Sequence, residues 1–223
     1  MSLLFRQTEI IGFINDLCDT FAQEVTQKNI SLQFDHGDMN ELDVWVDPAN
    51  FDKIVLNILS NAFKFTPSGG SVHISLTKGE DDAADGPLRH YMELVIADTG
   101  IGIANGEMEH VFERFYQIRN NLNNSNVGTG VGLHLTRSLV ELHHGTIHTE
   151  SNADGPGTRF VIRIPLGNSH LRPEELDNSD KQPAIELPVE DQPASVISTA
   201  AVDDESKVRS KSKNWVLIVE DDE

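Results

Sequence analysis

Two asparagines and a lysine recur at helical spacing in NILSNAFKFTPSGG, which spans residues 57–70. Asn57, Asn61 and Lys64 stand at positions i, i+4 and i+7, so on a helix they form one narrow stripe. Amide oxygens suit a hard cation such as magnesium, and a lysine provides a point charge for a phosphate. Taken alone, the stripe is equally typical of a solvated helix edge, because Asn and Lys are common on protein surfaces.

A carboxylate and two glycines follow in ADTGIGI, residues 97–103. Asp98 ends the most apolar segment of the chain, and a carboxylate there can accept a hydrogen bond from an exocyclic amine such as that of adenine. Gly100 and Gly102 allow a tight turn and a close approach of a ligand to the backbone. On its own, this pattern also fits a common turn in which the aspartate caps the next element.

Three glycines, Gly128, Gly130 and Gly132, lead directly into a helical pattern in NVGTGVGLHL. Backbone N–H groups and the positive end of that helix would face a bound phosphate. The pattern is not a P-loop, because no Lys-Ser or Lys-Thr follows it, and a polar loop rather than a strand precedes it, which argues against a dinucleotide-binding turn. A last pair of glycines, in GPGTRF at residues 155–160, by itself favours an ordinary hairpin.

Hydrophobic periodicity indicates which elements must position these residues. Helices are predicted over residues 8–28, 48–66, 107–115 and 131–144, and strands over residues 31–36, 42–47, 71–78, 90–98, 146–151 and 157–166. Asp47 as N-cap and Pro48 at the first position should open the second helix. The mixture predicts an α/β fold, one mixed sheet with helices packed on one face.

The composition of the 223 residues limits the class of protein. A formal net charge of −19 argues against a nucleic-acid binder or a protein of anionic membrane surfaces. The single cysteine, Cys18, excludes an internal disulfide and a cysteine zinc site and suggests a reducing compartment. No apolar run approaches the roughly 20 residues of a membrane span, and the start lacks the features of a signal peptide.

Apolar periodicity is nearly continuous up to residue 166 and then stops, which predicts a domain over residues 1–166. Residues 167–213 are rich in Pro, Ser, Asp and Glu, a composition that cannot offset chain entropy, so they are expected to form an acidic flexible linker. Residues 214–223, NWVLIVEDDE, restore a strand-like apolar run that ends in acids. A further element is therefore expected to begin there.

In their order and spacing, these stretches resemble the sensor histidine kinases. NILSNAFKFTP is similar to the N box of that family, DTGIGI to its first glycine box and VFERFYQ to its F box. GTGVGLHL with its following helix resembles the second glycine box, and GPGTRF resembles the final Gly-Thr block. The resemblance covers roughly residues 8–166. It implies the two-layer α/β sandwich shared with gyrase-type ATPases, heat-shock ATPase chaperones and mismatch-repair ATPases.

The resemblance implies an ATP site between the N-box helix and the glycine boxes. It makes Asn61 a magnesium ligand through ATP, with Asn57 beside it. Asn57 and Lys64 are the expected catalytic residues, and Lys64 is expected to reach a phosphate. Asp98 would accept a hydrogen bond from the adenine amine. The other expected ATP-binding residues are Phe65 near the adenine, Gly100, Gly102 and Ile103 along the base, Gly128, Thr129, Gly130, Gly132 and Leu133 around the phosphates, and Thr158 in the last block. Residues 116–127, rich in asparagine, would form a mobile lid.

One position separates a kinase from a hydrolase. Gyrase-like relatives carry a glutamate one turn before the magnesium asparagine, where it activates water. Here that position is Asn57, an amide that cannot serve as a general base, whereas phosphoryl transfer depends mainly on positioning and charge neutralisation. A kinase is therefore favoured over an ATP hydrolase. The third alternative is a module that binds a nucleotide or a partner without chemistry, and the intact Asn61, Lys64 and Asp98 count against it.

None of the nine histidines has the phosphoacceptor context of these kinases, a His followed by an acidic residue and then Arg-Thr-Pro or similar. The resemblance implies that the phosphate goes to a histidine on a dimerisation domain absent from this chain. WVLIVEDDE resembles the first strand of a receiver domain, with Glu220 and Asp221 as paired acids. The expectation is a hybrid histidine kinase, the cytoplasmic part of a bacterial membrane sensor. Its receiver would be a partner in cis, and this fragment would contact neither nucleic acid nor membrane.

Overall fold

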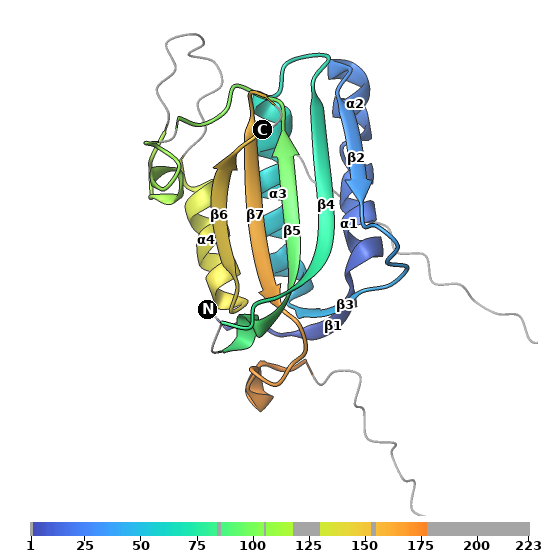
Figure 1. The fold of residues 1–223 in the computed structure, drawn as a ribbon, viewed down its shortest axis with the longest axis vertical. Helices are drawn as coiled ribbons and strands as arrows, with labels where there is room; N and C mark the ends of the chain where they lie inside the picture. The colour runs from blue at the N-terminus through green and yellow to red at the C-terminus, as the bar shows by residue number, and fades with distance from the viewer. Residues whose placement is uncertain (1, 84–85, 105, 118–129, 153–154, 178–223) are drawn as a thin grey trace, which may run out of the picture. The chain divides into compact units, whose positions relative to one another are not determined.

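The computed structural model describes residues 2–83, 86–104, 106–117, 130–152 and 155–177, which form a two-layer α/β sandwich (Figure 1). The strands of its main sheet lie in the order β2 (Ser31–Asp35), β4 (Ser71–Glu80), β5 (His90–Asp98), β7 (Thr158–Pro165) and β6 (Thr146–Ser151). β2 and β4 pair in parallel, and the other neighbours are antiparallel. The predicted fold class is confirmed.

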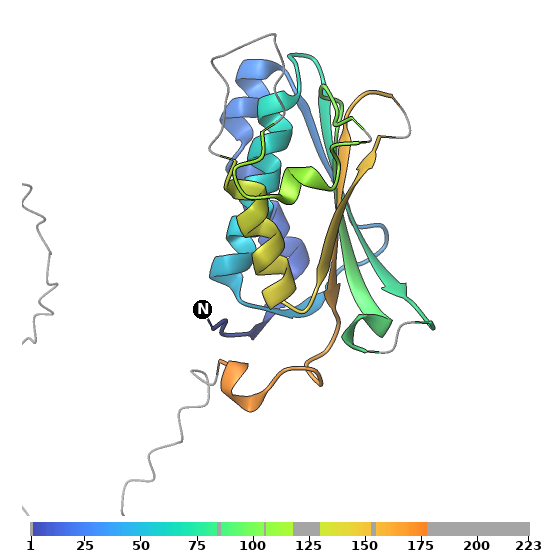
Figure 2. The same ribbon diagram turned by 90° about the vertical axis from the view of Figure 1, so that its left-hand side faces the viewer.

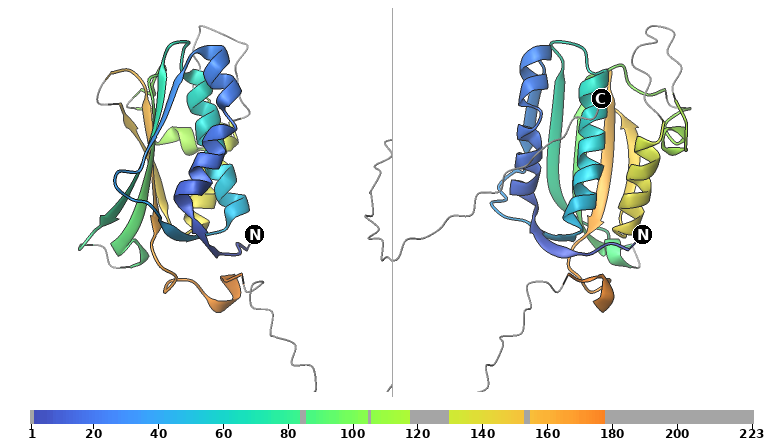
Figure 3. Two further views of the ribbon diagram at one scale, coloured as in Figure 1. Left: turned by 90° about the vertical axis from the view of Figure 1, so that its right-hand side faces the viewer. Right: turned by 180° about the vertical axis from the view of Figure 1, so that it is seen from behind.

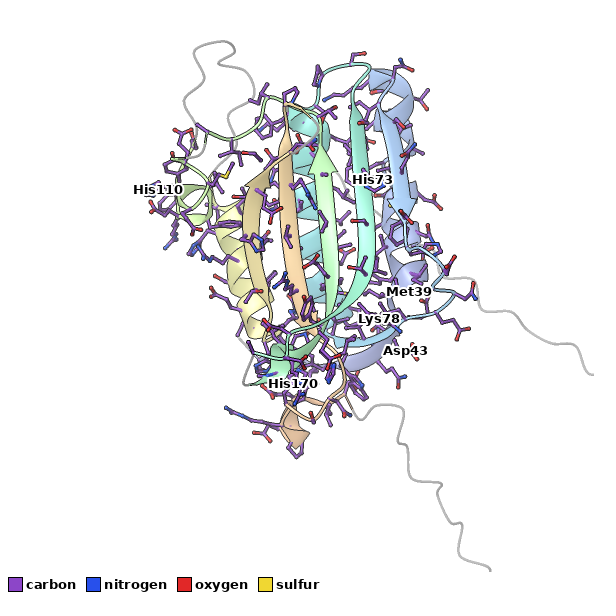
Figure 4. All side chains as sticks on the ribbon, viewed as in Figure 1. Met39, Asp43, His73, Lys78, His110 and His170 are labelled. Carbon is purple, nitrogen blue, oxygen red and sulfur yellow. The ribbon has the colours of Figure 1, made fainter. Side chains whose placement is uncertain are left out.

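Helices cover one face of this sheet, as the side view shows (Figure 2). Seen from behind, α1 (Ile10–Asp19) with α2 (Ala22–Lys28), then α3 (Pro48–Phe65), then α4 (Gly132–Leu142) lie side by side across that face (Figure 3). In the described part of the chain, no helix covers the opposite face, where the labelled His73 lies (Figure 4). Among the same residues, no helix is long and apolar enough to cross a membrane.

The local sequence explains why α3 begins and ends where it does. The Asp47 carboxylate accepts a hydrogen bond from the backbone N–H of Asn50 at 3.1 Å, and Pro48 occupies the first helical position, where its missing N–H costs nothing. The helix ends at Phe65, two residues before Pro67. Both predicted boundaries of this helix are confirmed.

Residues 8–28 form two helices, α1 and α2, rather than the single helix predicted, and α1 begins two residues later than expected. The break follows α1, where the Thr20 hydroxyl donates to the Leu17 carbonyl oxygen at 2.7 Å and competes with the helical bonding. Phe21 then turns into the core, where its ring stacks on that of Phe63 with 4.9 Å between centroids. Packing of this one ring outweighs the local helical pattern.

The strand predicted at residues 42–47 is present as β3 (Asp43–Val46). The prediction of one sheet is wrong for this strand, because β3 does not join the main sheet. It pairs with β1 (Arg6–Glu9) in a separate two-stranded sheet. Val44 and Val46 point into the core with no exposed surface, whereas Asp43 is exposed. The alternation of apolar and polar residues along this segment therefore indicated a strand correctly, but it could not indicate which other strand this one pairs with.

The helix predicted at residues 107–115 is also shorter than expected. Only a single 3₁₀ turn, η2 (His110–Phe112), is regular there. Val111 and Phe112 are buried and the residues around them are not, so one turn is enough to place both apolar side chains in the core.

Residues 167–177, predicted to begin a flexible linker, instead pack against the N-terminal segment. The backbone N–H of Phe5 donates to the carbonyl oxygen of Glu175 at 2.7 Å, and the N–H of Asp177 donates to the carbonyl oxygen of Phe5 at 2.8 Å. The compact part of the chain thus extends beyond residue 166. The rest of the predicted linker and the predicted receiver strand, residues 178–223, lie outside the described residues.

Candidate functional site

α3 places the predicted stripe at the border of its buried face. Asn57, Asn61 and Lys64 are half-buried, while the apolar residues on the neighbouring arc are enclosed. These enclosed residues, each at most 1% exposed, are Phe51, Ile54, Ile58, Leu59 and Ala62. The stripe therefore follows one edge of the buried face of α3.

Asp98 ends β5 and is removed almost completely from water, with 5% of its surface exposed. One carboxylate oxygen, Oδ1, accepts hydrogen bonds from the backbone N–H groups of Gly100 at 2.8 Å and Thr158 at 3.3 Å. Burial raises the pKa of this carboxyl above its usual value, and the two N–H groups oppose that rise only in part. The result is a rigid, desolvated carboxyl group at the end of the most apolar strand.

Two glycines bring three backbone segments together around this carboxyl group. A Cβ on Gly100 would lie 2.7 Å from the Asp98 Oδ1 and 2.7 Å from the carbonyl oxygen of Phe65, so the loop after β5 runs directly against the end of α3. A Cβ on Gly157 would lie 1.8 Å from the Asp98 carbonyl oxygen, which only glycine permits. The Asn152 amide donates to that same carbonyl oxygen at 3.1 Å. The N box, first glycine box and final block therefore meet at Asp98.

A surface pocket of about 400 Å³ opens beside this junction. Gly102 and Ile103, both predicted to line the base, contribute to its wall. The wall is completed by Ile101, Ala104, Glu107, Ser151, Gly155, Pro156 and Gly157. The asparagines and the lysine of the stripe do not line it. The structure thus separates the predicted residues into a pocket next to the first glycine box and a polar edge on α3.

The start of α4 lies against the stripe. The Asn57 side chain donates from Nδ2 to the Thr136 hydroxyl at 2.7 Å. A Cβ on Gly132 would lie 2.5 Å from the Asn57 Oδ1, so only a glycine leaves room for this amide. The predicted residues Asn57 and Gly132 are therefore in direct contact. The sequence did not single out Thr136, although it follows Gly132 by four residues and so shares its helix face.

Lys64 and Phe65 are neighbours at the end of α3. The Lys64 Nζ lies 5.1 Å from the centroid of the Phe65 ring, and Phe65 is 42% exposed. The cation thus lies over the aromatic face at the end of the helix.

Residues on either side of the predicted lid, Phe115 and Gly130, are in contact, because the Gly130 carbonyl oxygen accepts a hydrogen bond from the N–H of Phe115 at 2.8 Å. Gly130 has a φ of +67°, a conformation that favours glycine. Leu133 packs, partly buried, against the core. Gly128, Thr129 and residues 118–127 of the predicted lid lie outside the described residues.

Comparison with known proteins gives a consistent result. Residues 46–168 match the family described as histidine kinase-, DNA gyrase B-, and HSP90-like ATPase. Sensor histidine kinase TmoS of Ectopseudomonas mendocina is 31% identical over 226 residues, which cover 99% of this chain and 22% of TmoS. Mycobacterial sensor histidine kinase MprB matches in structure with a TM-score of 0.58 and 27% identity, covering 73% of this chain and 98% of that one. Full-length ShkA, solved in complex with AMPPNP, matches in fold with a TM-score of 0.60 and 23% identity, covering 75% of this chain and 32% of that one.

The chain therefore belongs to the family of histidine kinase-, DNA gyrase B-, and HSP90-like ATPases. The predicted resemblance to the ATP-binding domain of sensor histidine kinases is confirmed, since relatives carrying that name match nearly the whole chain. The curated relatives are much longer. The chain spans 16% of Histidine kinase P4 of Formosa agariphila and 22% of TmoS.

Proposed function

We propose that this chain is the ATP-binding catalytic domain of a sensor histidine kinase and that it donates the γ-phosphate of ATP to a histidine on a separate dimerisation domain. One observation carries the proposal. The polar stripe of α3 (Asn57, Asn61 and Lys64) and the buried carboxyl group of Asp98 lie on elements that close approaches at glycines bring into contact. The polar groups suited to a metal-bound triphosphate thus lie on α3, and this helix ends beside the Asp98 carboxyl group, which is suited to the adenine amine.

Each described residue has a role consistent with its surroundings. Bound ATP with magnesium would supply the phosphoryl group. Asp98 would accept a hydrogen bond from the adenine amine, because backbone N–H groups already fix its carboxylate. Asn61 would ligate magnesium through ATP with Asn57 beside it, and Lys64 would neutralise phosphate charge. The remaining proposed ATP-binding residues are Phe65, Gly100, Gly102, Ile103, Gly128, Thr129, Gly130, Gly132, Leu133 and Thr158.

Transfer to histidine is favoured over hydrolysis by the chemistry at residue 57. An amide cannot take a proton from water, and the Asn57 amide nitrogen is engaged by the Thr136 hydroxyl. A site without a water-activating base can still donate a phosphoryl group to a nucleophile that another domain presents, because such transfer depends on positioning and charge neutralisation.

The proposal also includes the partners. The phosphoacceptor histidine would come from a dimerisation domain of the same protein, since no histidine here has the expected sequence context. Residues 1–166 with the packed segment that follows would form the catalytic domain, and residues 214–223 would begin a receiver in cis. Because ATP is a cytoplasmic substrate, we place this part of the sensor in the cytoplasm.

Nucleotide titration tests the proposal. The 223-residue chain should bind ATP more tightly with magnesium than with EDTA, as measured by calorimetry. After incubation with ATP labelled at the γ-phosphate, it should carry no acid-labile label and release no free phosphate. Absence of ATP binding would overturn the proposal. Steady phosphate release would favour the gyrase-like hydrolase instead, and acid-labile label on the chain would mean that one of its own histidines is the acceptor.

A further inference from the structure

The Asn57 side chain is held between two residues of α4. Its Nδ2 donates to the hydroxyl of Thr136 at 2.7 Å, and its Oδ1 lies 2.5 Å from the position that a Cβ on Gly132 would take. Gly132 and Thr136 are four residues apart on one helix and so face the same way. Together they form the surface on which the Asn57 amide lies. Thr136 provides a hydrogen bond, and Gly132, which has no side chain, leaves space for the amide.

The burial of the two partners differs. Thr136 is 1% exposed, so its hydroxyl has no access to bulk water, whereas Asn57 is half-buried. A fixed buried hydroxyl holds the nitrogen end of the amide. The oxygen end lies over the first turn of α4, where backbone N–H groups have no partner within the helix and the N-cap residue, Val131, makes no side-chain cap. The free end of the amide thus faces the place where the glycine-rich segment leads into the helix.

We infer that Thr136 is a positioning residue for Asn57: it fixes the orientation in which that amide meets the metal-bound triphosphate. The inference rests on the function proposed above. An amide that is already held in place loses little further freedom when a ligand binds, whereas a freely rotating one must be ordered at that moment. Thr136 itself touches neither the nucleotide nor the metal and acts only through Asn57.

Substitutions at Thr136 in the full 223-residue chain test this inference. Thr136→Val keeps the shape but removes the hydrogen-bonding oxygen, and Thr136→Ser keeps the oxygen. We expect Thr136→Val to weaken binding of ATP with magnesium roughly ten-fold, close to the 1.4 kcal/mol that corresponds to a factor of ten, and Thr136→Ser to restore it to within about two-fold. Adenosine, which has no phosphate, should bind all three proteins equally well.

Two controls separate positioning from general damage to α4. Ser138→Ala removes another hydroxyl of the same helix, one that donates to the His134 carbonyl oxygen one turn before it, and should change neither affinity. In an Asn57→Ala background, Thr136→Val should cause no further loss, because the residue that it positions is gone. If Thr136→Val does not fold, Thr136→Ala provides the same comparison.

The outcomes are distinct. Failure of the unsubstituted chain to bind ATP would overturn the proposed function. If that chain binds ATP and Thr136→Val binds it equally well, the positioning role is overturned while the proposed function stands. Equal loss of ATP and adenosine affinity, without rescue by Thr136→Ser, would assign Thr136 a purely structural role and also overturn the inference.

Discussion

At the scale of the single residue, Asp98, which we propose binds the adenine amine, holds its carboxyl group in a desolvated environment. Desolvation is the main influence on its carboxyl group and raises its pKa above the usual value, while backbone N–H bonds from Gly100 and Thr158 act in the opposite direction. The folded chain therefore holds this proton more tightly than the unfolded chain. Its contribution to stability falls as the pH rises through the ordinary carboxyl range, because the unfolded state ionises first. Such a group is typical of a binding site.

Asp98→Asn should separate stability from binding. The amide oxygen can still accept the two backbone N–H groups, and no charge remains to be desolvated, so the unfolding midpoint near neutral pH should be no lower than that of the unsubstituted protein. ATP affinity should fall by about 1–3 kcal/mol, the usual cost of losing a hydrogen bond to a charged group. Thermal unfolding and calorimetry with ATP measure both.

Asp43→Asn is the matched control for this change, because Asp43 lies exposed in the two-stranded sheet (Figure 4), where its carboxylate accepts a hydrogen bond from the Gln7 side chain at 2.8 Å. It should alter neither the midpoint nor the affinity. If the Asp98→Asn protein folds well and its affinity for ATP equals that of the unsubstituted protein, Asp98 is ruled out as the residue that binds the adenine amine.

The sequence could predict the stripe of α3 and Asp98 because each is a polar group in an apolar local pattern. It could not predict Thr136 or Asn152. Thr136 contacts a residue 79 positions away, and Asn152 contacts one 54 positions away. Periodicity reports which neighbours along the chain share a face, and it carries no information on which distant element will supply the partner.

At the scale of elements, both ends of α4 contact α3 or the residue just before it. Near the start of α4, Asn57 contacts Gly132 and Thr136. At the other end of α4, the buried His143 accepts a hydrogen bond at Nε2 from the N–H of Asp47, at 3.1 Å, just before α3 begins. Its Nδ1–H donates to the Leu139 carbonyl oxygen at 2.7 Å. The two helices are therefore antiparallel, and a neutral imidazole completes their second contact.

His143 should make stability depend on pH. Burial lowers the pKa of this imidazole below its ordinary value of 6.5, because the charged form loses its hydration inside the protein. Its contribution is fully present above about pH 6.5 and is lost as the pH falls below it, because the unfolded chain takes up the proton first. His143→Phe should cost about 1–3 kcal/mol at pH 7 from unpaired backbone groups, and should reduce the loss between pH 7 and pH 5.

Urea unfolding at several pH values measures this effect. His170, whose pKa is also lowered by burial, remains in the variant, so the pH dependence should shrink without vanishing. An unaltered slope in His143→Phe would show that His143 does not titrate with folding.

Helices and strands with a strong local signal were predicted well. α3 has a capping aspartate, a proline at its first position and a continuous apolar arc, so all its signals agree. The segment at residues 8–28 has the same apolar periodicity but no local signal for the turn at Phe21, whose stacking on Phe63 is a tertiary contact. β3 was found as a strand, while its pairing with β1 depends on where the N-terminal segment lies.

At the scale of the whole described chain, its first and last segments meet. Phe5 is 1% exposed, and its ring contacts those of His143 and His144, with 5.4 Å and 6.1 Å between centroids. The N–H of Leu4 donates to the Asp47 carboxylate at 3.0 Å. Glu175 and the residues beside it then cover Phe5 from the far end of the chain.

Truncation tests whether that junction belongs to the folded domain. A chain ending at residue 166 should be less stable than one ending at residue 182 by about 1–3 kcal/mol, because the backbone groups of Phe5 lose their partners and its ring loses its cover. Urea denaturation of the two chains measures the difference. In a Phe5→Ala background, where there is no ring left to cover, the same truncation should cost less. If the chains that end at residues 166 and 182, both with Phe5 intact, are equally stable, the domain boundary lies at residue 166. The contact between the segments of Phe5 and Glu175 would then contribute nothing to folding.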